Sequence, residues 1–324
     1  MPDKQSPIRS GFTAATTAAE ILEGRDLSNF TAIVTGGHSG LGLETTRALT
    51  GAGARVIVAA RNVQAAREKL SDMTNIEIEK LDLADLASIH RFAQRFLESH
   101  RHIDILIGSA AIMACPETRV GPGWEAQFAT NHLGHYALIN LLWPALKGGS
   151  RVVAVSSAGH HWSDIRWDDL HFDDGYDKWL AYGQSKTAVA LLALQLDQLG
   201  QKDGVRAFSV HPGKILTPLQ RHLPQEEMIA AGWLDQNGAP TADPSFKTPQ
   251  QGAATQVWAA TSPQLDGKGG LYCEDCDIAA LDEGEQSSLV GVRPYAADRQ
   301  QAKRLWALSA QLTGVNSFEA SNER

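Results

Sequence analysis

The sequence predicts an α/β fold, in which a doubly wound parallel sheet carries helices on both faces. Two observations predict it. From residue 30 to residue 213, short β-branched runs alternate with longer segments whose apolar residues recur about every 3.6 positions. In addition, a glycine-rich turn, TGGHSGLG at 35–42, stands between the first such run and the first helical segment. Together these features indicate one domain that passes repeatedly from strand to helix.

The alternation places each expected element. Because they are short, apolar and rich in β-branched residues, six runs are predicted to be buried strands: 30–36, 54–60, 75–80, 103–110, 151–157 and 204–213. The segments between them carry the helical period, most clearly at 43–53, 63–73, 86–100 and 182–200. Since no linker-like break interrupts this order before about residue 213, a single domain is expected.

Three regions extend or interrupt the alternation. We predict a leader at 1–27 with a short helix near 17–24, the main α/β domain at 28–283, and a C-terminal helical extension at 284–324 with an amphipathic helix at 296–313. Within the domain, the long segments 160–180 and 214–250 are predicted to be substrate loops, the second with a helix near 224–233.

Composition limits the classes of partner. The chain has 324 residues, 43% of them hydrophobic and 20% charged, which is typical of a folded globular protein. Its net charge of −8 argues against a nucleic acid or an anionic membrane as the main partner. No apolar run has the length of a membrane-spanning helix, and the first residues lack the layout of a signal peptide. With three cysteines, the chain is not a disulfide scaffold, and a cytoplasmic location is expected.

The glycine-rich turn predicts a site for a dinucleotide. Gly36 permits a tight turn, Gly40 lets the backbone approach a pyrophosphate, and Gly42 lets the following helix pack closely on the strand. The amides at the start of that helix then face the phosphates. A glycine-rich turn without a ligand is the alternative. Its position after the first strand of a βαβ unit favours the Rossmann-type cofactor site.

The end of the second strand indicates which dinucleotide is preferred. An NAD site usually carries an acidic residue there, whereas this strand ends Ala60-Arg61-Asn62. Because a guanidinium suits a phosphate, Arg61 is predicted to bind the 2′-phosphate of NADP(H), with NAD(H) as the alternative. A solvated Arg61 is also consistent with the sequence. Asp82 is expected near the adenine or, alternatively, at the cap of the helix that begins near Asp85.

A tyrosine and a lysine four positions apart, in AYGQSK at 181–186, indicate acid–base chemistry. Tyr182 and Lys186 lie one turn apart on one face of a predicted helix that follows Ser156 and Ser157 at the end of a strand. Parallel sheets bind ligands at such carboxyl ends. Because free tyrosine has a pKa near 10, a nearby ammonium and an oxidised nicotinamide are expected to lower it, so that Tyr182 exchanges a proton with a substrate oxygen.

Five motifs in the expected order resemble those of the short-chain dehydrogenases/reductases over residues from about 28 to 275: TGGHSGLG, Asn131 in TNHLGHY, VSS at 155–157, YGQSK and HPG at 211–213. Within that family the chain is similar to the retinol dehydrogenase and WW-domain oxidoreductase branch. The similarity lies in TTAAEILEGRDL before the first strand, in NHLGHY, and in the long segment between Ser157 and Tyr182.

The resemblance implies roles for matching residues. Tyr182 would be the acid/base, Ser157 would bind the reacting oxygen, Asn131 would support a water that connects to solvent, and Lys186 would hold the nicotinamide ribose and lower the pKa of Tyr182. Structural alternatives are a helix kink at Asn131 and a strand-end turn at Ser157. The predicted cofactor contacts are Gly36, His38, Ser39, Gly40, Leu41, Gly42, Arg61, Asp82, Leu83, Ser109, Ala110, Ala111, Tyr182, Lys186, Pro212, Gly213 and Thr217. Of these, His38 could contact a phosphate, but the sequence favours a solvent-facing loop histidine at this position.

One segment departs from the family pattern. Where the family usually has Asn-Asn-Ala-Gly after the fourth strand, this chain has Gly108-Ser109-Ala110-Ala111. Serine cannot span the hydrogen bonds that asparagine makes, so a less rigid sheet beneath the cofactor is expected. This motivates a rival hypothesis, a cofactor-binding sensor or scaffold with weak catalysis. Reduction of a C=C bond, as in the related protochlorophyllide reductases, is a third hypothesis.

Other chemistry-bearing residues are given structural interpretations. Cys273 and Cys276 have metal or redox spacing but lack further ligands, so buried or loop thiols are favoured and no metal site is predicted. The pair His160-His161 is predicted to lack carboxylate companions and is not expected to bind metal. Five aromatic residues between 160 and 180 either face an apolar substrate or pack their own loop: Trp162, Trp167, Phe172, Tyr176 and Trp179.

The sequence therefore predicts an oxidoreductase that interconverts an alcohol and a ketone or aldehyde, with NADP(H) preferred. A lipophilic or aromatic small molecule is the expected substrate. Retinol itself is not implied, because the chain lacks the hydrophobic anchors of the membrane-embedded members of that branch. No nucleic-acid or membrane partner is expected, whereas a homo-oligomer is compatible with the sequence.

Overall fold

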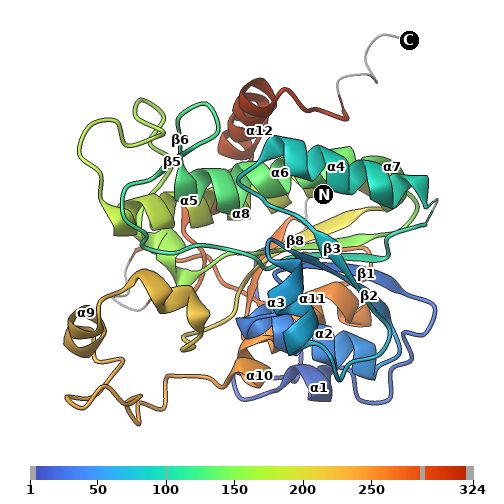
Figure 1. The fold of residues 1–324 in the computed structure, drawn as a ribbon, viewed down its shortest axis with the longest axis horizontal. Helices are drawn as coiled ribbons and strands as arrows, with labels where there is room; N and C mark the ends of the chain where they lie inside the picture. The colour runs from blue at the N-terminus through green and yellow to red at the C-terminus, as the bar shows by residue number, and fades with distance from the viewer. Residues whose placement is uncertain (1–4, 100, 285–288, 319–324) are drawn as a thin grey trace.

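A central eight-stranded sheet organises the molecule (Figure 1). The computed structural model describes residues 5–99, 101–284 and 289–318. Parts of the predicted leader and C-terminal extension, at 1–4, 285–288 and 319–324, lie outside the described residues. The strand order β10-β9-β8-β7-β4-β1-β2-β3 reverses its direction of growth between β1 and β4, as in a doubly wound sheet.

All strand pairs of this sheet are parallel except β10 with β9. The six predicted strands are confirmed with shorter bounds, as β1 Thr31–Thr35, β2 Arg55–Ala60, β3 Ile76–Lys80, β4 Ile105–Gly108, β7 Arg151–Val155 and β8 Arg206–His211. Sequence analysis did not identify β9 Leu271–Glu274, β10 Asp277–Ile278 or the small hairpin of β5 Arg119–Val120 and β6 Trp124–Glu125.

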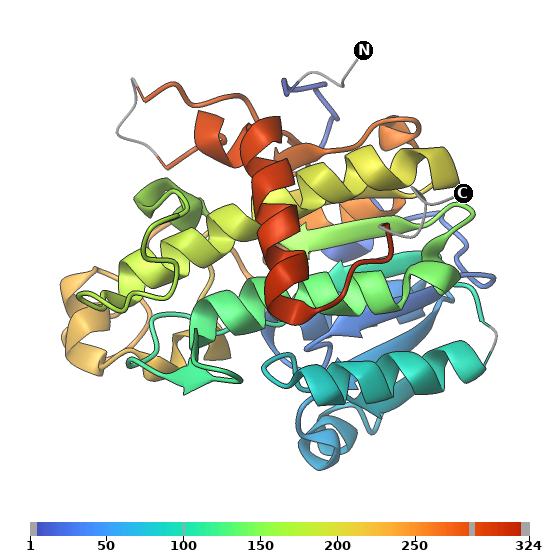
Figure 2. The ribbon, with the colours of Figure 1, turned by 90° about the horizontal axis from the view of Figure 1, so that it is seen from above.

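Helices cover both faces of the sheet (Figure 1). One face carries α1 Ala18–Ile21, α2 Gly40–Gly51, α3 Val63–Lys69, α10 Pro249–Gly252 and α11 Ala254–Thr261. The other carries α4 Leu86–Glu98, α6 Gly134–Leu141, α7 Trp143–Leu146 and α8 Lys178–Gly200. The last helix, α12 Arg299–Thr313, lies across α8 (Figure 2) and confirms the predicted C-terminal helix.

The remaining helical segments are short. They are α5 Ala126–Phe128, α9 Gln225–Ala230, the π-helical turn η1 Ala129–Leu133, and the 3₁₀ turns η2 Ala158–Trp162, η3 Gln201–Asp203, η4 Pro218–His222, η5 Pro263–Leu265 and η6 Pro294–Ala297. The expected helix near 224–233 is thus present as α9.

The strands are apolar on both sides because two separate cores pack against them. Successive residues of β1 illustrate this: Ile33 belongs to the core under α4, α6 and α8, whereas Val34 belongs to the core over α2 and α11. Both side chains are fully buried. This alternation follows from the period of two along a strand, and it explains why the inner strands β1, β2, β4 and β7 are mostly apolar. The edge strand β3, by contrast, carries Glu77 and Glu79.

Helix α8 lies at the centre of its layer, between the sheet and α12. Most of its 23 residues are buried, including Lys186 and Gln184. Its start is fixed by Asp177, whose carboxylate accepts hydrogen bonds from the amides of Trp179 and Leu180, each at 2.8 Å. The helix therefore presents its first two turns at a defined position beside the ends of the strands.

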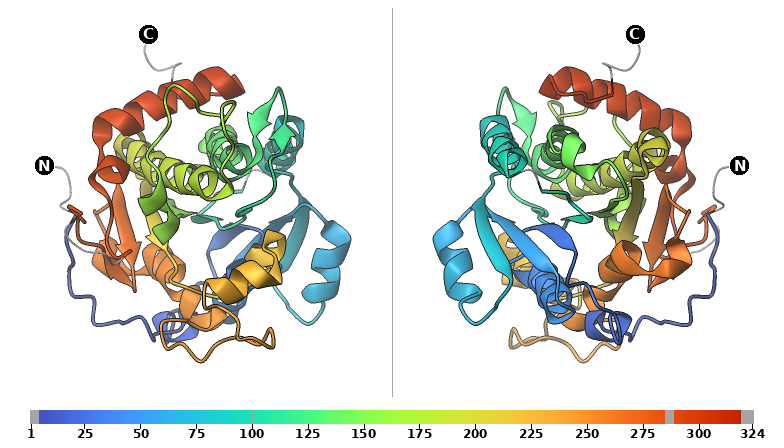
Figure 3. Two further views of the ribbon diagram at one scale, coloured as in Figure 1. Left: turned by 90° about the vertical axis from the view of Figure 1, so that its left-hand side faces the viewer. Right: turned by 90° about the vertical axis from the view of Figure 1, so that its right-hand side faces the viewer.

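The predicted substrate loops lie together at one end of the molecule, on the left in Figure 1 and toward the viewer in the left panel of Figure 3. The 214–250 segment is attached to α8 through Glu227, which accepts hydrogen bonds from Trp179 (2.9 Å) and Lys178 (2.5 Å). Within the described part of the chain, no helix is long and apolar enough to cross a membrane.

Candidate active site

A single large cavity, with a volume of about 1300 Å³, brings the predicted cofactor residues together at the carboxyl ends of the strands. All seventeen predicted contacts line it, from Gly36 in the glycine-rich turn to Thr217. Ser157 lines it as well. Asn131 does not, because it lies behind the cavity wall and is 1% exposed. The cavity is long enough to join a phosphate-binding end to an acid–base end.

The glycine-rich turn has the geometry that a pyrophosphate site requires. Gly36 and Gly40 have φ values of 67° and 52°, a conformation that favours glycine. A Cβ on Gly42 would lie 2.5 Å from the carbonyl oxygen of Gly36, so only glycine lets α2 approach the turn. Ser39 precedes α2 and makes no side-chain capping bond, which leaves the first amides of the helix facing the cavity. These residues fit a dinucleotide phosphate.

Basic side chains gather at the end of β2. Arg61 is exposed and lines the cavity, and Arg221, from the 214–250 segment, lies near enough for their charges to interact. Burial lowers the pKa of Arg221, and the charge of Arg61 lowers it further. The neighbouring Asn62 caps α3 by accepting a hydrogen bond from the amide of Ala65 (3.1 Å). No acidic residue occupies the strand end, so this wall is suited to an additional phosphate.

His38 is half-buried rather than solvent-facing, in contrast to the alternative that the sequence favoured. Its Nδ1 atom is buried without a hydrogen-bond partner among the described residues. Burial lowers the pKa of His38, and the nearby Lys69 adds to that effect. A buried donor or acceptor that lines an open cavity is available to a ligand.

Asp82 lines the cavity, while the helix cap that was considered for it belongs to its neighbour. The carboxylate of Asp85 accepts a hydrogen bond from the amide of Ala87 (2.9 Å) and begins α4. Asp82 instead accepts from the amide of Ala84 (3.0 Å) through one carboxylate oxygen. Its position is thus compatible with contact to a base.

Ser157, Tyr182 and Lys186 meet at the opposite end of the cavity. Ser157 lies two residues beyond β7, and its hydroxyl lies near enough to the phenol of Tyr182 to favour the ionised form of that phenol. The amine of Lys186 donates to the carbonyl of Val155 (2.9 Å) and lies 5.5 Å from the centre of the Tyr182 ring. Both Tyr182 and Lys186 are only 3% exposed. The spacing in YGQSK therefore places the two groups on one face of α8, as predicted.

Burial changes the protonation of both groups. It raises the pKa of Tyr182 to about 12, against the opposing hydrogen bond from Ser157, and it lowers the pKa of Lys186 to about 7. Without a bound nicotinamide the pKa of Tyr182 is thus raised, and its expected lowering by Lys186 together with an oxidised nicotinamide stays a prediction. The physical reason for the raised pKa is that desolvation penalises the phenolate and also removes part of the charge of the lysine.

Asn131 lies in the π-helical turn η1, so it marks an irregularity in its helix as well as carrying a polar side chain. Its amide exchanges two hydrogen bonds with the backbone of Ile112, both at 3.0 Å, and donates a third to Ser185 (2.9 Å). All of these partners are protein groups. The side chain thus ties the segment after β4 to α8, directly beneath Tyr182.

His135 accounts for the unusual Gly108-Ser109-Ala110-Ala111 segment. A Cβ on Gly108 would lie 2.9 Å from Cδ2 of His135, so the imidazole occupies the space of the missing side chain. The ring donates from Nδ1 to the carbonyl of Asn131 (2.9 Å) and contacts Thr35 through Nε2 (2.9 Å). Thr35 in turn accepts from the amide of Ala110 (3.0 Å). The expected loss of rigidity is therefore offset by a histidine from α6.

The aromatic residues between 160 and 180 divide between the two interpretations. Trp162 lines the cavity and packs 6.3 Å from Tyr182, centroid to centroid. The other four do not line it. Trp167 binds α12 through Gln301 (2.9 Å), and Trp179 packs edge-to-face on Trp162 at 5.3 Å. Only one of the five is therefore placed to touch a substrate directly, and the others shape its loop.

Several cavity residues were not singled out from the sequence. Lys247 packs over Gly213, where a Cβ would lie 2.7 Å from its side chain, and Glu274 from β9 lines the same end. Burial raises the pKa of Glu274 to about 7. Leu289 and Val290 complete this wall from the C-terminal side. None of these residues belongs to a local motif, since each reaches the site only through the tertiary fold.

The two motifs that were interpreted structurally have different outcomes. Cys273 and Cys276 are buried and unpaired, and burial raises the pKa of both thiols. The statement that the histidine pair lacks a carboxylate companion is wrong, because His161 lies 3.3 Å from Asp282. Sequence distance hid this partner. Among the residues that the structure describes, no three potential ligands group together as a metal would require.

Comparison with known proteins identifies relatives along most of the chain. The family profile described as short chain dehydrogenase matches residues 30–228. A probable oxidoreductase from Streptomyces lividans is 43% identical over 294 residues, which are 88% of this chain and 98% of that protein. Retinol dehydrogenase 12 from Mus musculus is 36% identical over 87% of this chain and 86% of its own length. The short-chain dehydrogenase/reductase prx1 from Penicillium roqueforti is 34% identical over 94% and 92%, respectively.

Solved structures share the fold. A protein of uncharacterized function from Mycobacterium Paratuberculosis superposes with a TM-score of 0.71 and 32% identity, covering 93% of this chain and 98% of that one. The Pseudomonas aeruginosa RhlG/NADP active-site complex superposes with a TM-score of 0.58 at 24% identity over 77% of this chain and 95% of that one. The second similarity concerns the fold alone.

The packing of His135 against Gly108 generates a stability prediction. We expect Gly108→Ala to lower the free energy of unfolding by about 1–3 kcal/mol, because the new methyl group must displace a ring that two hydrogen bonds hold. In a His135→Ala background the same substitution should cost at least about 1 kcal/mol less. Urea unfolding of the four proteins measures this coupling. Equal costs in both backgrounds would contradict the assignment of His135 to the vacant space.

Burial of Lys186 generates a pH-dependent prediction. Its folded pKa of about 7 lies below the value of about 10.4 for an unfolded lysine, so the unfolded chain binds more protons between these values. The resulting penalty is complete below pH 7 and fades as the pH rises toward 10. Lys186→Met should therefore raise the thermal midpoint most at about pH 6 and least at about pH 9.5. A pH-independent difference between variant and parent would refute the buried, depressed lysine.

Proposed function

Because the chain belongs to the short-chain dehydrogenase/reductase family, we propose that it is an NAD(P)-dependent enzyme that interconverts an alcohol and a ketone or aldehyde. The observation that carries the proposal is the convergence of Ser157, Tyr182 and Lys186 at one end of the cavity whose other end is the glycine-rich turn. These groups provide proton transfer and oxygen binding within reach of one bound dinucleotide.

In this proposal the side chains divide the chemistry at the substrate oxygen. A bound nicotinamide would supply or accept the hydride at the substrate carbon. Tyr182 gives a proton to the oxygen during reduction and takes it during oxidation. Ser157 accepts a hydrogen bond from the amide of Gly159 (3.0 Å), so its own hydroxyl hydrogen remains free to bind the substrate oxygen or the phenol. Lys186 keeps its amine beneath the phenol, and its ammonium form favours the phenolate.

Asn131 supports this arrangement from behind the cavity. By joining the backbone of Ile112 to Ser185 on α8, it holds the first turns of that helix against the cavity floor. Ser185 lies between Tyr182 and Lys186 in the sequence and donates to the carbonyl of Tyr182 (2.7 Å). We assign Asn131 a positioning role that reaches the acid–base pair through these bonds.

An apolar, ring-bearing substrate fits the outer part of the cavity. Trp162, Trp233, Met113 and Leu219 line it around Tyr182, and their side chains offer few hydrogen-bonding groups. Such a surface favours a lipophilic or aromatic carbonyl compound over a sugar or an amino acid. The relative retinol dehydrogenase 12 is named for a lipophilic alcohol, and this similarity supports the same substrate class.

The experiment that tests the activity follows NADPH absorbance against a panel of aliphatic and aromatic aldehydes and ketones. We expect turnover that Tyr182→Phe reduces by about a thousandfold, while NADPH binding is retained. Tyr176→Phe is the matched control, because that phenol lies in the neighbouring loop and does not line the cavity.

Two outcomes would favour the rivals. Tight NADPH binding without turnover on the whole panel would indicate the sensor or scaffold. That hypothesis was motivated by an expected loss of rigidity around Gly108, where the His135 ring packs. A saturated ketone as the product of an unsaturated ketone would indicate C=C reduction.

We further propose that NADP(H) is preferred over NAD(H), because Arg61 and Arg221 lie near each other at the end of β2, where the strand end carries no acidic residue. Arg61→Ala should weaken NADPH binding by about 10- to 100-fold, as expected for the loss of charge-assisted hydrogen bonds, and NADH binding by less than about threefold. Arg67→Ala, an exposed arginine on α3 that does not line the cavity, is the control. Equal losses of both cofactors would overturn the preference, and titration of cofactor fluorescence measures them.

We propose a reducing, cytoplasmic setting for this activity, supported by three cysteines that are all buried and unpaired. The partner expected on this basis is the small-molecule substrate. A homo-oligomer is compatible with the proposal, and the mass of the particle in solution would decide it.

A further inference from the structure

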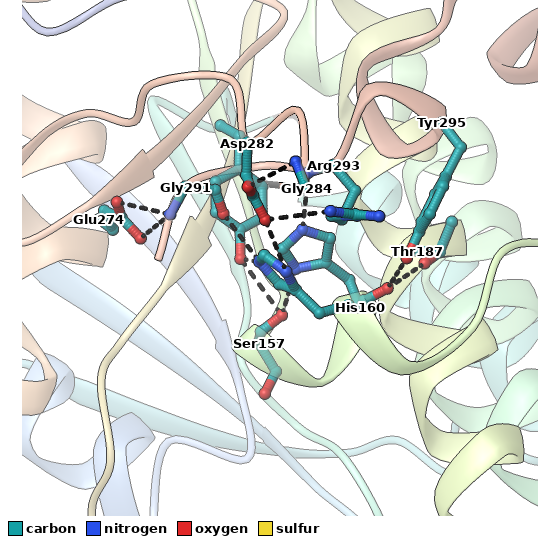
Figure 4. Close-up of polar contacts among 11 residues, drawn as sticks. Ser157, His160, Thr187, Glu274, Asp282, Gly284, Gly291, Arg293 and Tyr295 are labelled. Atoms are coloured by element: carbon teal, nitrogen blue, oxygen red, sulfur yellow. Dashed lines mark hydrogen bonds and ion pairs between the residues drawn. The ribbon is translucent and has the colours of Figure 1, made fainter. Parts of the chain in front are cut away.

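The backbone of Ser157 is held by a group of contacts that the proposed chemistry does not use. Its carbonyl oxygen accepts three hydrogen bonds: from the amide of His160 (3.1 Å), from the His160 ring at Nδ1 (2.7 Å), and from the hydroxyl of Tyr272 (3.2 Å). His160 is 0% exposed. Figure 4 shows its ring between Ser157 on one side and Arg293 on the other. The imidazole therefore fills the gap between the predicted catalytic serine and the C-terminal part of the chain.

The two neighbours fix the form of the His160 ring. The amide of Arg293 can only donate, so Nε2, which lies 3.2 Å from it, must carry a lone pair. The carbonyl of Ser157 can only accept, so Nδ1 carries the proton. Burial agrees with this neutral form, since it lowers the pKa of His160 to about 3. The ring is thus a directional link between two backbone groups.

The C-terminal end of this link is a segment that walls the cavity, Leu289 to Arg293. Gly291 donates from its amide to both carboxylate oxygens of Glu274 (2.9 and 3.1 Å), and its carbonyl accepts from His161 (3.2 Å). Next to it, Leu289 and Val290 line the cavity and are 45% and 59% exposed. Neighbouring apolar side chains exposed at the rim of a cavity favour contact with an apolar ligand.

We propose that His160 is a positioning residue that sets the place of Ser157 and couples it to the Leu289–Arg293 segment, whose apolar side chains select bulky lipophilic substrates. The proposal rests on the proposed function and adds to it a specificity wall and its connection to the serine. In this proposal a bulky substrate contacts Leu289 and Val290. A shift of that segment is passed through the Arg293 backbone and the His160 ring to Ser157, which binds the substrate oxygen.

The backbone around His160 has other supports, so replacement of the ring leaves the turn in place. Its carbonyl accepts hydrogen bonds from Tyr295 (2.7 Å) and from Thr187 on α8 (3.2 Å). Figure 4 shows both hydroxyl groups on the side of the residue away from Ser157. Substitutions at 160 therefore test the ring itself.

Two substitutions at 160 separate the two ends of the link. In His160→Asn the amide nitrogen takes the place of Nδ1 and keeps the donor to Ser157 but loses the acceptor for Arg293. In His160→Gln the longer amide reaches Arg293 and loses the donor to Ser157. We expect His160→Gln to lower kcat by about tenfold or more, the loss of roughly one hydrogen bond in the transition state. His160→Asn should lower kcat by no more than about threefold while raising KM for bulky substrates.

A second pair of variants tests the same link from the C-terminal segment. Arg293 has φ −67°, which proline adopts without strain, so Arg293→Pro removes the amide hydrogen that His160 accepts. Arg293→Ala keeps that hydrogen and removes only the guanidinium, which pairs with Asp282 at 3.3 Å. We expect the proline variant to raise KM for bulky carbonyl compounds by at least about threefold over the alanine variant, with small aldehydes unaffected by the difference.

The measurements distinguish this proposal from the function on which it rests. Steady-state kinetics with one small aldehyde and one bulky aromatic ketone give kcat and KM for each variant, and NADPH binding confirms that each is folded. Equal losses of kcat in His160→Asn and His160→Gln would overturn the proposal, as would equal KM values in the two Arg293 variants. A wild-type protein that binds NADPH without turnover would instead refute the function. In either case, ¹H–¹⁵N spectra of the imidazole report its tautomer, and a proton on Nε2 would overturn the link.

Discussion

The hydrogen bond from the Lys186 amine to the Val155 carbonyl is the contact on which the arrangement of the site depends. It joins α8, which carries Tyr182, to β7, which ends immediately before Ser156 and Ser157. A second bond in the opposite direction, from the Ser156 hydroxyl to the Lys186 carbonyl (2.8 Å), fixes the same two elements. The phenol and the serine therefore share one frame, and neither can move without breaking a bond inside the core.

Burial of the Lys186 amine lowers the stability of the folded chain. A lysine with 3% exposure and a pKa near 7 stabilises the folded chain less than an apolar residue of similar size would. Such a residue is easier to explain by chemistry than by packing, because sites that handle protons are where shifted pKa values gather. The same desolvation raises the pKa of Tyr182, so the pair is prepared for a positively charged ligand that would restore the balance toward the phenolate.

Around this frame, buried histidines serve as neutral connectors. His132, His135 and His160 are at most 4% exposed, and burial lowers their pKa values to about 3, 4 and 3. Each joins elements that are distant in the sequence: His132 reaches Ser309 of α12 (2.7 Å), His135 reaches Thr35 of β1, and His160 reaches the backbone of Arg293. A neutral imidazole offers one donor and one acceptor on opposite edges, so the rings of His135 and His160 each link two partners. Nδ1 of His132, by contrast, is buried without a hydrogen-bond partner among the described residues.

The sequence predicted what depends on local pattern. Strand and helix periods predicted the six parallel strands from β1 to β8 and the covering helices, and the motifs predicted seventeen of the residues that line the cavity, from Gly36 to Thr217. The sequence could not reveal that the His135 ring fills the space beside Gly108, or that Asp282 lies beside His161. These partners are 27 and 121 residues apart along the chain. Nor could the sequence show which aromatic residues of 160–180 line the cavity. Trp162 lines it and Trp167 bonds to α12 instead, a difference that only the tertiary packing determines.

The two ends of the cavity are built in different ways, and this difference bears on how specificity arises. The dinucleotide end consists of strand ends and one glycine-rich turn, which the two apolar cores hold from both sides. The substrate end consists of loop segments that side-chain hydrogen bonds hold in place: Glu227 holds α9 to the start of α8, and Glu274 and His161 hold Gly291 beside Leu289 and Val290. Exchange of residues in those segments alters few core contacts. The substrate range of this fold can therefore change at its outer wall while the acid–base frame beneath stays the same.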